Sequence, residues 1–85
     1  MIQRIGDPVS VSSFFDHQKR SLVPKEIIWR GRNYTINKIG LHHAYYQGNT
    51  LYHVFSVSND SLFFRLVLNS KSLLWKLEEV ADEFG

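Results

Sequence analysis

Apolar and polar residues alternate along most of this sequence, in short runs that end at turn-forming residues. In the first run, Val9, Val11 and Phe15 share one face and serines lie between them, which is the two-residue period of a half-buried strand. The residues that interrupt the runs are Gly6-Asp7-Pro8, Pro24, Gly31, Gly40, Gln47-Gly48-Asn49, Ser58-Asn59-Asp60-Ser61 and Asn69-Ser70-Lys71-Ser72. Turn signals at this spacing predict an all-β domain. We expect a small antiparallel sheet of five or six strands, curled into a barrel-like or roll-like meander.

The first tight turn lies in the segment WRGRNY, residues 29–34. With Gly31-Arg32 at its centre, a type II′ turn has glycine at the position that requires it. This register places Trp29 opposite Tyr34 and Ile27 opposite Ile36. The next strand is expected to pass Gly40 on its way to Tyr46, with a bulge or bend at the glycine.

Two further turns define the middle of the sheet. Gly48-Asn49 at the centre of the first pairs Tyr45 with Tyr52 and Ala44 with His53. Asn59-Asp60 at the second sets Phe55 opposite Phe64 and Val57 opposite Leu62. The face expected to form the core then carries His53, Phe55, Val57, Leu62, Phe64, Leu66 and Leu68. The opposite face carries Tyr52, Val54, Phe63, Arg65 and Val67, and is either half covered or an exposed aromatic patch.

The C-terminal segment fits two structures. As a strand over 73–78, it places Leu73, Trp75 and Leu77 opposite Leu68, Leu66 and Phe64, and it sets Arg65 against Lys76. Helical spacing also fits, through Leu73, Leu77, Val80, Ala81 and Phe84. We favour the strand, followed by a short frayed or helical tail.

Length and composition narrow the class of protein. The 85 residues fit one domain over 1–85, with a core over about 8–80 and an acidic tail over 78–85. The absence of cysteine excludes disulfides, Cys-based zinc sites and thiol nucleophiles. No run reaches the ~18–20 apolar residues of a membrane helix, and the N-terminal residues have no apolar core of a signal peptide. The expectation is a cytoplasmic protein with no membrane association.

Charge is distributed unevenly along the chain. Residues 1–77 carry ten basic and four acidic residues, a balance of +6, whereas the last eight residues, EEVADEFG, carry −4. A basic body with an acidic end is typical of some nucleic-acid binders and also of ordinary solvated surfaces.

The segments PVSVSSFFD (8–16), WRGRNYTI (29–36) and the closing Trp75-Lys76-Leu77 resemble a family of small uncharacterised bacterial proteins. That family has an early W-R-G-R-x-Y-x-V hairpin, an aromatic-rich middle strand and a C-terminal W-x-L strand. The resemblance covers about residues 8–80 and implies a small antiparallel β domain. It brings no catalytic residues. Some members lie near or are fused to lesion-bypass DNA polymerases, which implies a role linked to nucleic acid. The chain departs from the pattern at 42–43 and 52–53, where histidine and tyrosine replace the tryptophan that members often carry.

Candidate chemistry is sparse. His42 and His53 are expected on one face, near each other, but two histidines do not complete a zinc site, and we predict no metal and no cofactor. No motif of a serine nucleophile, acid–base pair or phosphate-binding loop occurs, so we expect no catalytic activity.

Two classes of function remain. The first is a binding or accessory module that contacts a protein partner, or a second copy of itself, through an open sheet edge. The second is a single-stranded nucleic-acid-binding module with a basic, Tyr-rich sheet face. The candidate binding residues are Arg30, Arg32, Tyr45, Tyr52 and Arg65. Nucleic-acid binding requires the arginines and the aromatic residues to share one continuous surface.

Overall fold

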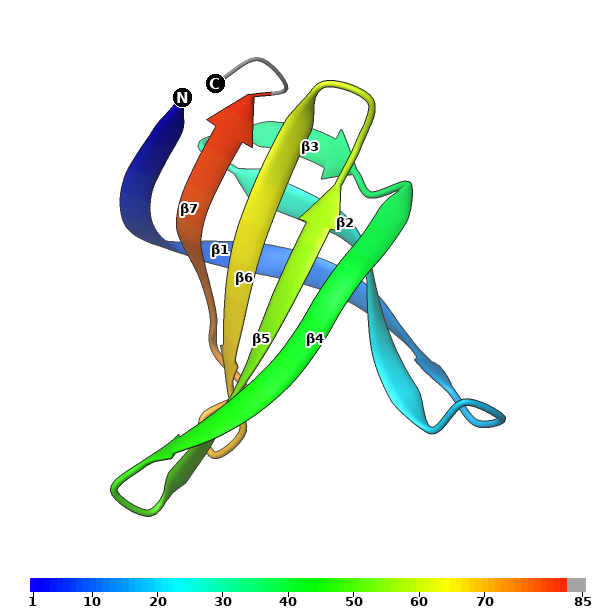
Figure 1. Cartoon of the computed structure of the whole chain (residues 1–85), viewed down its shortest axis with the longest axis vertical. Coiled ribbons are helices and arrows are strands. Elements are labelled where there is room, and N and C mark those ends of the chain that lie inside the picture. The colour runs from blue at the N-terminus through cyan, green and yellow to red at the C-terminus, as the bar shows by residue number, and fades with distance from the viewer. Residues whose placement is uncertain (83–85) are drawn as a thin grey trace.

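The computed structural model describes residues 1–82, and all of its regular structure is β-strand (Figure 1). The strands are β1 (Ile2–Asp16), β2 (Ser21–Trp29), β3 (Arg32–Thr35), β4 (Lys38–Gln47), β5 (Thr50–Ser58), β6 (Leu62–Asn69) and β7 (Trp75–Asp82). They form one antiparallel sheet in the order β3-β2-β1-β7-β6-β5-β4. The predicted all-β class is confirmed. The described residues contain seven strands rather than five or six, because residues 32–35 form a strand of their own, separate from β4.

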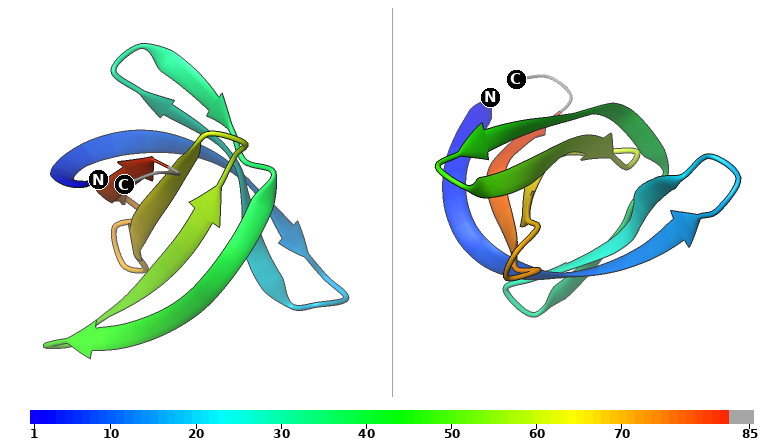
Figure 2. Two further views of the ribbon diagram at one scale, coloured as in Figure 1. Left: turned by 45° about the horizontal axis from the view of Figure 1, so that its top comes forward. Right: turned by 90° about the horizontal axis from the view of Figure 1, so that it is seen from below.

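The sheet curls because β1 changes partner along its length (Figure 2). Residues 2–9 of β1 pair with β7, and residues 10–16 pair with β2. A bulge between Arg4 and Asp7 bends the strand, with Gly6 at a φ of 74° that suits glycine. Within residues 1–82 the terminal strands β3 and β4 do not pair with each other, so the sheet is an open roll and not a closed barrel.

The core lies on the inner, concave face of this roll. Its buried residues are Ile27, Ile36, Phe55, Val57, Phe64, Leu66, Leu68, Leu77 and Val80. The core face predicted for residues 53–68 is therefore confirmed in its buried members. Both tryptophans, Trp29 and Trp75, are half-buried and pack against this cluster.

Two hairpins extend beyond the core (Figure 1). One joins β1 to β2 and the other joins β4 to β5. A bulge between Ser12 and Ser13 interrupts the alternation of β1, so the prediction that Phe15 shares a buried face with Val9 and Val11 is wrong. Val9 and Val11 pack against the core, whereas Phe15 is exposed in the β1–β2 hairpin.

The predicted Gly31-Arg32 turn is displaced by one residue. Trp29 pairs with Arg32 and Ile27 with Tyr34, so the turn residues are Arg30 and Gly31. Their φ angles are 52° and 77°, the left-handed values that a type I′ turn requires at both positions. Type I′ turns follow the right-handed twist of paired strands, and that geometry prevails here although Arg30 has to adopt a conformation that favours glycine.

The Gly48-Asn49 turn is confirmed with its pairs Tyr45–Tyr52 and Ala44–His53. A bulge between Ile39 and His42 confirms the irregularity expected at Gly40. A Cβ at Gly40 would lie 3.1 Å from the backbone oxygen of Ser56, so the close approach of the two strands there favours glycine.

The registers on both sides of β6 differ from prediction because an asparagine closes each loop. The difference is two residues on the β5 side and, on the β7 side, two residues as far as Leu66, where a bulge shifts the pairing by one more. Asn59 accepts hydrogen bonds from the N–H groups of Ser61 and Leu62, each at 2.8 Å, and lengthens the first loop. Val57 therefore faces Phe64, and Phe55 faces Leu66. A shift of two residues keeps every side chain on its predicted face.

Asn69 repeats this arrangement before β7, with its Oδ1 accepting from the N–H groups of Lys71 and Ser72. The last strand therefore begins at Trp75, which faces Leu68, and not at Leu73. The expected frayed or helical tail is wrong through Asp82, because β7 pairs with β1 on one side and with β6 on the other. Phe84 lies outside the described residues.

Candidate functional site

The five predicted binding residues are divided between the two faces of the sheet. Tyr45 and Tyr52 face each other on β4 and β5, and their stacked rings have centroids 5.3 Å apart. Both alternate with core residues and so lie on the outer face, as does Arg65 on β6. Arg30 instead lies in the β2–β3 turn, and Arg32 begins β3 directly after it. The guanidinium of Arg30 lies over the ring of Trp29, whose side chain belongs to the inner face.

Arg30 takes part in a cluster that fastens the β2–β3 hairpin to β1. Asp7 accepts hydrogen bonds from Trp29 Nε1 at 2.9 Å and from Arg30 Nε at 3.2 Å. The Arg30 guanidinium carbon lies 4.6 Å from the centre of the Trp29 ring. The hydrogen bond from Trp29 is the main reason that the pKa of Asp7 lies below its usual value. Desolvation opposes this lowering, and the charge and hydrogen bond of Arg30 add to it. These contacts give Arg30 a structural role in holding the hairpin.

An ion pair between Arg65 and Glu78 makes the outer face less basic. Arg65 Nε lies 3.0 Å from Glu78 Oε1, and Arg65 faces Glu79 across the ladder. The prediction that Arg65 faces Lys76 is wrong, because the longer loop before β7 brings Val67 opposite Lys76. Arg65, Glu79, Phe63 and Lys38 line a shallow depression of about 380 Å³ on the outer face. A nucleic-acid backbone would meet carboxylates there as well as cations.

His42 and His53 approach each other as expected. His42 Nε2 lies 3.0 Å from His53 Nδ1, and the His42 ring stacks on Phe55 with centroids 4.2 Å apart. Burial against these neighbours and the charges of His53 and His43 lower the pKa of His42. A short contact between two ring nitrogens needs one of them to act as acceptor, so His42 Nε2 and His53 Nδ1 do not both carry a proton. Among residues 1–82, no three side chains of metal-binding type gather at one place.

The two terminal strands of the sheet differ in how far they are protected. β3 is four residues long and carries Arg32 and Asn33, which is how proteins commonly blunt an edge. β4 has ten residues, every one of them exposed, and its only charged residue is Lys38 at the start. Leu41 is 63% exposed and Tyr46 is 72% exposed. β4 is thus a long and partly apolar edge with no Asp, Glu, Lys or Arg beyond Lys38, which is the type that accepts another strand.

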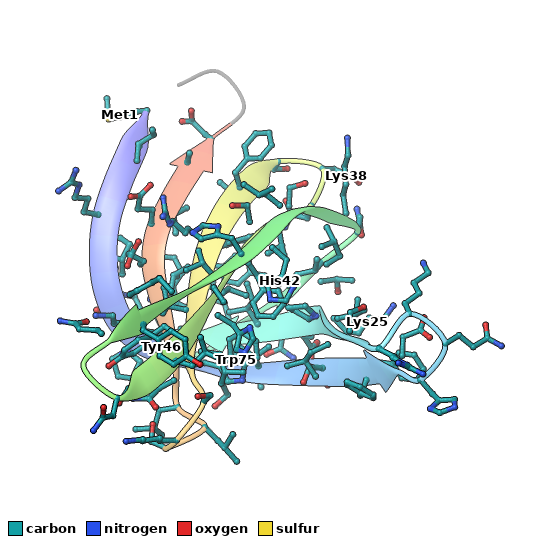
Figure 3. The ribbon with its side chains drawn as sticks, turned by 60° about the horizontal axis from the view of Figure 1, so that its bottom comes forward. Met1, Lys25, Lys38, His42, Tyr46 and Trp75 are labelled. Carbon is teal, nitrogen blue, oxygen red and sulfur yellow. The ribbon has the colours of Figure 1, made fainter. Side chains whose placement is uncertain are left out.

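The backbone of β4 presents hydrogen-bonding groups along this edge. The carbonyl of Leu51 accepts a hydrogen bond from Ser70 N–H at 3.0 Å, so Leu51 directs its backbone toward β6. Alternate residues of a strand direct their backbone groups to opposite sides, so Tyr52 directs its groups toward β4, and its cross-strand partner Tyr45 directs its groups toward β5. The intervening residues of β4, which are His42, Ala44 and Tyr46, then direct N–H and C=O groups away from β5. We call this side of the strand the β4 edge; Figure 3 shows His42 and Tyr46 along the strand.

Sequence reasoning expected an open sheet edge but did not locate it. The signal was present, because residues 39–59 contain no Asp, Glu, Lys or Arg. That run includes β5, which is central and half-buried, so the pattern alone does not separate a buried strand from an unprotected edge.

Comparisons with known proteins assign the chain to no family, because no family model, no curated protein and no solved structure matches it. In the part of the chain that the structure describes, no helix is long and apolar enough to cross a membrane.

Proposed function

We propose that this protein is a small β binding module, without catalytic activity of its own, that recognises an extended segment of a polypeptide chain by adding it to β4. The observation that carries the proposal is the β4 edge, ten exposed residues long and lacking the charges that keep edges apart. Main-chain hydrogen bonds would supply affinity, and the side chains beside them would supply selectivity.

The division of the five predicted binding residues favours this function over single-stranded nucleic-acid binding. Arg30 and Arg65 are both engaged with carboxylates, at 3.2 and 3.0 Å. The stacked tyrosines Tyr45 and Tyr52 lie on the outer face, away from the Arg30–Trp29 contact. A strand added to the β4 edge needs none of these arginines to be free.

The proposal can be tested with a displayed library of short, extended peptides. Peptides that bind the wild-type protein are counter-selected against Ala44→Pro, which removes one N–H from the β4 edge but leaves the β4–β5 ladder intact. Ala44→Thr keeps the N–H and serves as the matched control. We expect selected peptides to bind the wild type and Ala44→Thr but not Ala44→Pro, and to slow exchange of the amide hydrogens of His42, Ala44 and Tyr46.

Peptides that bind Ala44→Pro as tightly as the wild type would contradict the proposal. Labelled single-stranded oligonucleotides, titrated by fluorescence anisotropy at two salt concentrations, test the other class of function. Binding that weakens steeply with salt would point to nucleic acid instead.

A further inference from the structure

The regular part of β4 carries ring side chains on both sides of a central alanine. Residues 42–46 read His-His-Ala-Tyr-Tyr, so antiparallel pairing of two copies about Ala44 sets each histidine opposite a tyrosine. We propose that the strand that adds to the β4 edge is β4 of a second copy of this chain, running antiparallel, with the two-fold axis at Ala44. This inference rests on the proposed function, since it names the partner of the same edge.

The backbone geometry fits a two-fold axis at Ala44. His42, Ala44 and Tyr46 are the residues whose backbone groups point away from β5. In an antiparallel pair centred on Ala44, each Ala44 bonds to the other, and each His42 bonds to Tyr46 of the second copy. Since every such pair exchanges two hydrogen bonds, the edge forms about six.

Neighbouring centres fit less well. An axis at His43 or at Tyr45 keeps only two regular pairs, or about four hydrogen bonds, before it meets the bulge at 39–42 or the turn at Gly48-Asn49. An axis at His43 also sets two histidines against each other. Ala44 is therefore the centre that uses the whole regular stretch.

The side chains agree with the same centre. On the inner face, His42 meets Tyr46 of the second copy, and on the outer face His43 meets Tyr45. These are ring-on-ring pairs between exposed residues, and no two like charges face each other. Ala44 has the smallest side chain of the five, so it does not obstruct its own copy at the axis.

The size of the contact sets the expected strength. A single strand pair over residues 42–46 buries less than the ~1,200 Å² at which stable interfaces begin. The dimer should therefore be reversible, with dissociation in the micromolar range. The second copy would compete with other extended peptides for binding to the β4 edge.

The experiment introduces a charged residue at position 44 to test whether this position lies on the two-fold axis. Ala44→Lys and Ala44→Glu each place two like charges directly opposite each other, but only if residue 44 faces itself. Sedimentation equilibrium should show concentration-dependent dimers for the wild type, with dimerisation weakened by about 100-fold or more in either variant. Mixing the two variants should restore a dimer containing one of each. Thr35→Lys, on the β3 edge, is the control and should dimerise like the wild type.

Thermal melts of each variant establish that a monomeric variant is folded. A wild type that stays monomeric at the highest soluble concentration would overturn the inference, as would an Ala44→Lys protein that dimerises normally. Two variants that stay monomeric when mixed would overturn the axis at Ala44. If the wild type is monomeric but selected peptides still bind at the β4 edge, the inference of a dimer fails and the proposed function stands.

Discussion

Truncation of two phenylalanines compares the inner face of the roll with the outer face. Phe55 on β5 is 1% exposed and stacks on His42, whereas Phe63 on β6 is 49% exposed. Phe55→Ala removes a fully buried ring, which costs ~1.5–3 kcal/mol for transfer and ~3–5 kcal/mol once a cavity remains. Phe63 keeps about half its surface in water, so Phe63→Ala should cost about 1 kcal/mol.

These values are large against the stability of the domain. At about 0.05–0.15 kcal/mol per residue, a chain of 85 residues has roughly 4–13 kcal/mol in total. Urea unfolding, followed by tryptophan fluorescence, measures the difference. With a slope near ~1 kcal/mol per molar urea, the Phe55→Ala midpoint should fall about 2 M or more below that of Phe63→Ala.

The comparison removes effects that both substitutions share, such as the lower strand propensity of alanine. Measurements at low protein concentration keep self-association out of the result. Equal losses for the two variants would mean that the inner face is not the core, and that the assignment of Phe55 to the buried face is wrong.

Three further predictions concern the polar contacts. Asp7→Asn should lower the unfolding temperature near neutral pH and reduce the fall of that temperature on acidification. Because the pKa of Asp7 is lowered in the folded state, the stability that its charge contributes is present above about pH 3.8 and is lost below it. An unchanged fall of the unfolding temperature at acidic pH would show that the contacts of Asp7 with Trp29 and Arg30 are unimportant for stability. Because the pKa of His42 is lowered from 6.5, protonation of His42 is less favourable in the folded state than in the unfolded state. Stability should therefore fall as the pH drops through about 6.5, and it should fall less in His42→Phe. Parallel curves of unfolding temperature against pH for the wild type and His42→Phe would refute this. Asn59→Ala leaves the N–H groups of Ser61 and Leu62 without their acceptor and should cost ~1–2 kcal/mol in urea unfolding. Ser61→Ala, in the same loop, keeps its N–H and is the control; it should cost less, and equal losses would speak against the Asn59 loop.

The alternation of residues was enough to predict the faces of β5 and β6. Phe55, Phe64 and Leu66 were expected in the core and are buried, because a side-chain period of two depends only on the extended backbone. The hairpin at Gly48-Asn49 was also predictable in full. Its two-residue loop leaves a single register once the flanking tyrosines are required to face each other.

The other registers depended on interactions that alternation does not encode. Asn59 and Asn69 use their side chains to close loops longer than a two-residue turn, which moves the β5–β6 ladder and the start of the β6–β7 ladder by two positions. A bulge between Arg65 and Leu66 moves the rest of the β6–β7 ladder by one more. Because a shift of two positions preserves the faces, the core prediction survived while the cross-strand pairs changed. The ion pair of Arg65 with Glu78 replaced the expected clash with Lys76 for this reason.

The binding surface was the least predictable feature. Arg30 is adjacent to Trp29 in the sequence and Arg32 lies two positions before Tyr34, but Asp7 lies 23 positions away from Arg30 and only the fold brings it there. Likewise, whether a strand lies at the edge or in the centre of a sheet depends on the pairing of the whole chain. β4 and β5 have similar composition, and only the strand order distinguishes them.

The division of β1 between two partners has a consequence for how the chain folds during synthesis. Ile2 pairs with Ala81 and Val9 with Trp75, so the first half of β1 has no strand beside it until β7 is made. Hairpins such as β4–β5 can close as soon as they leave the ribosome, but the two parts of the sheet join only afterwards. Until then β6 is a second unpaired edge, next to the core residues Leu66 and Leu68. The nascent chain is therefore most prone to aggregate just before its last strand emerges.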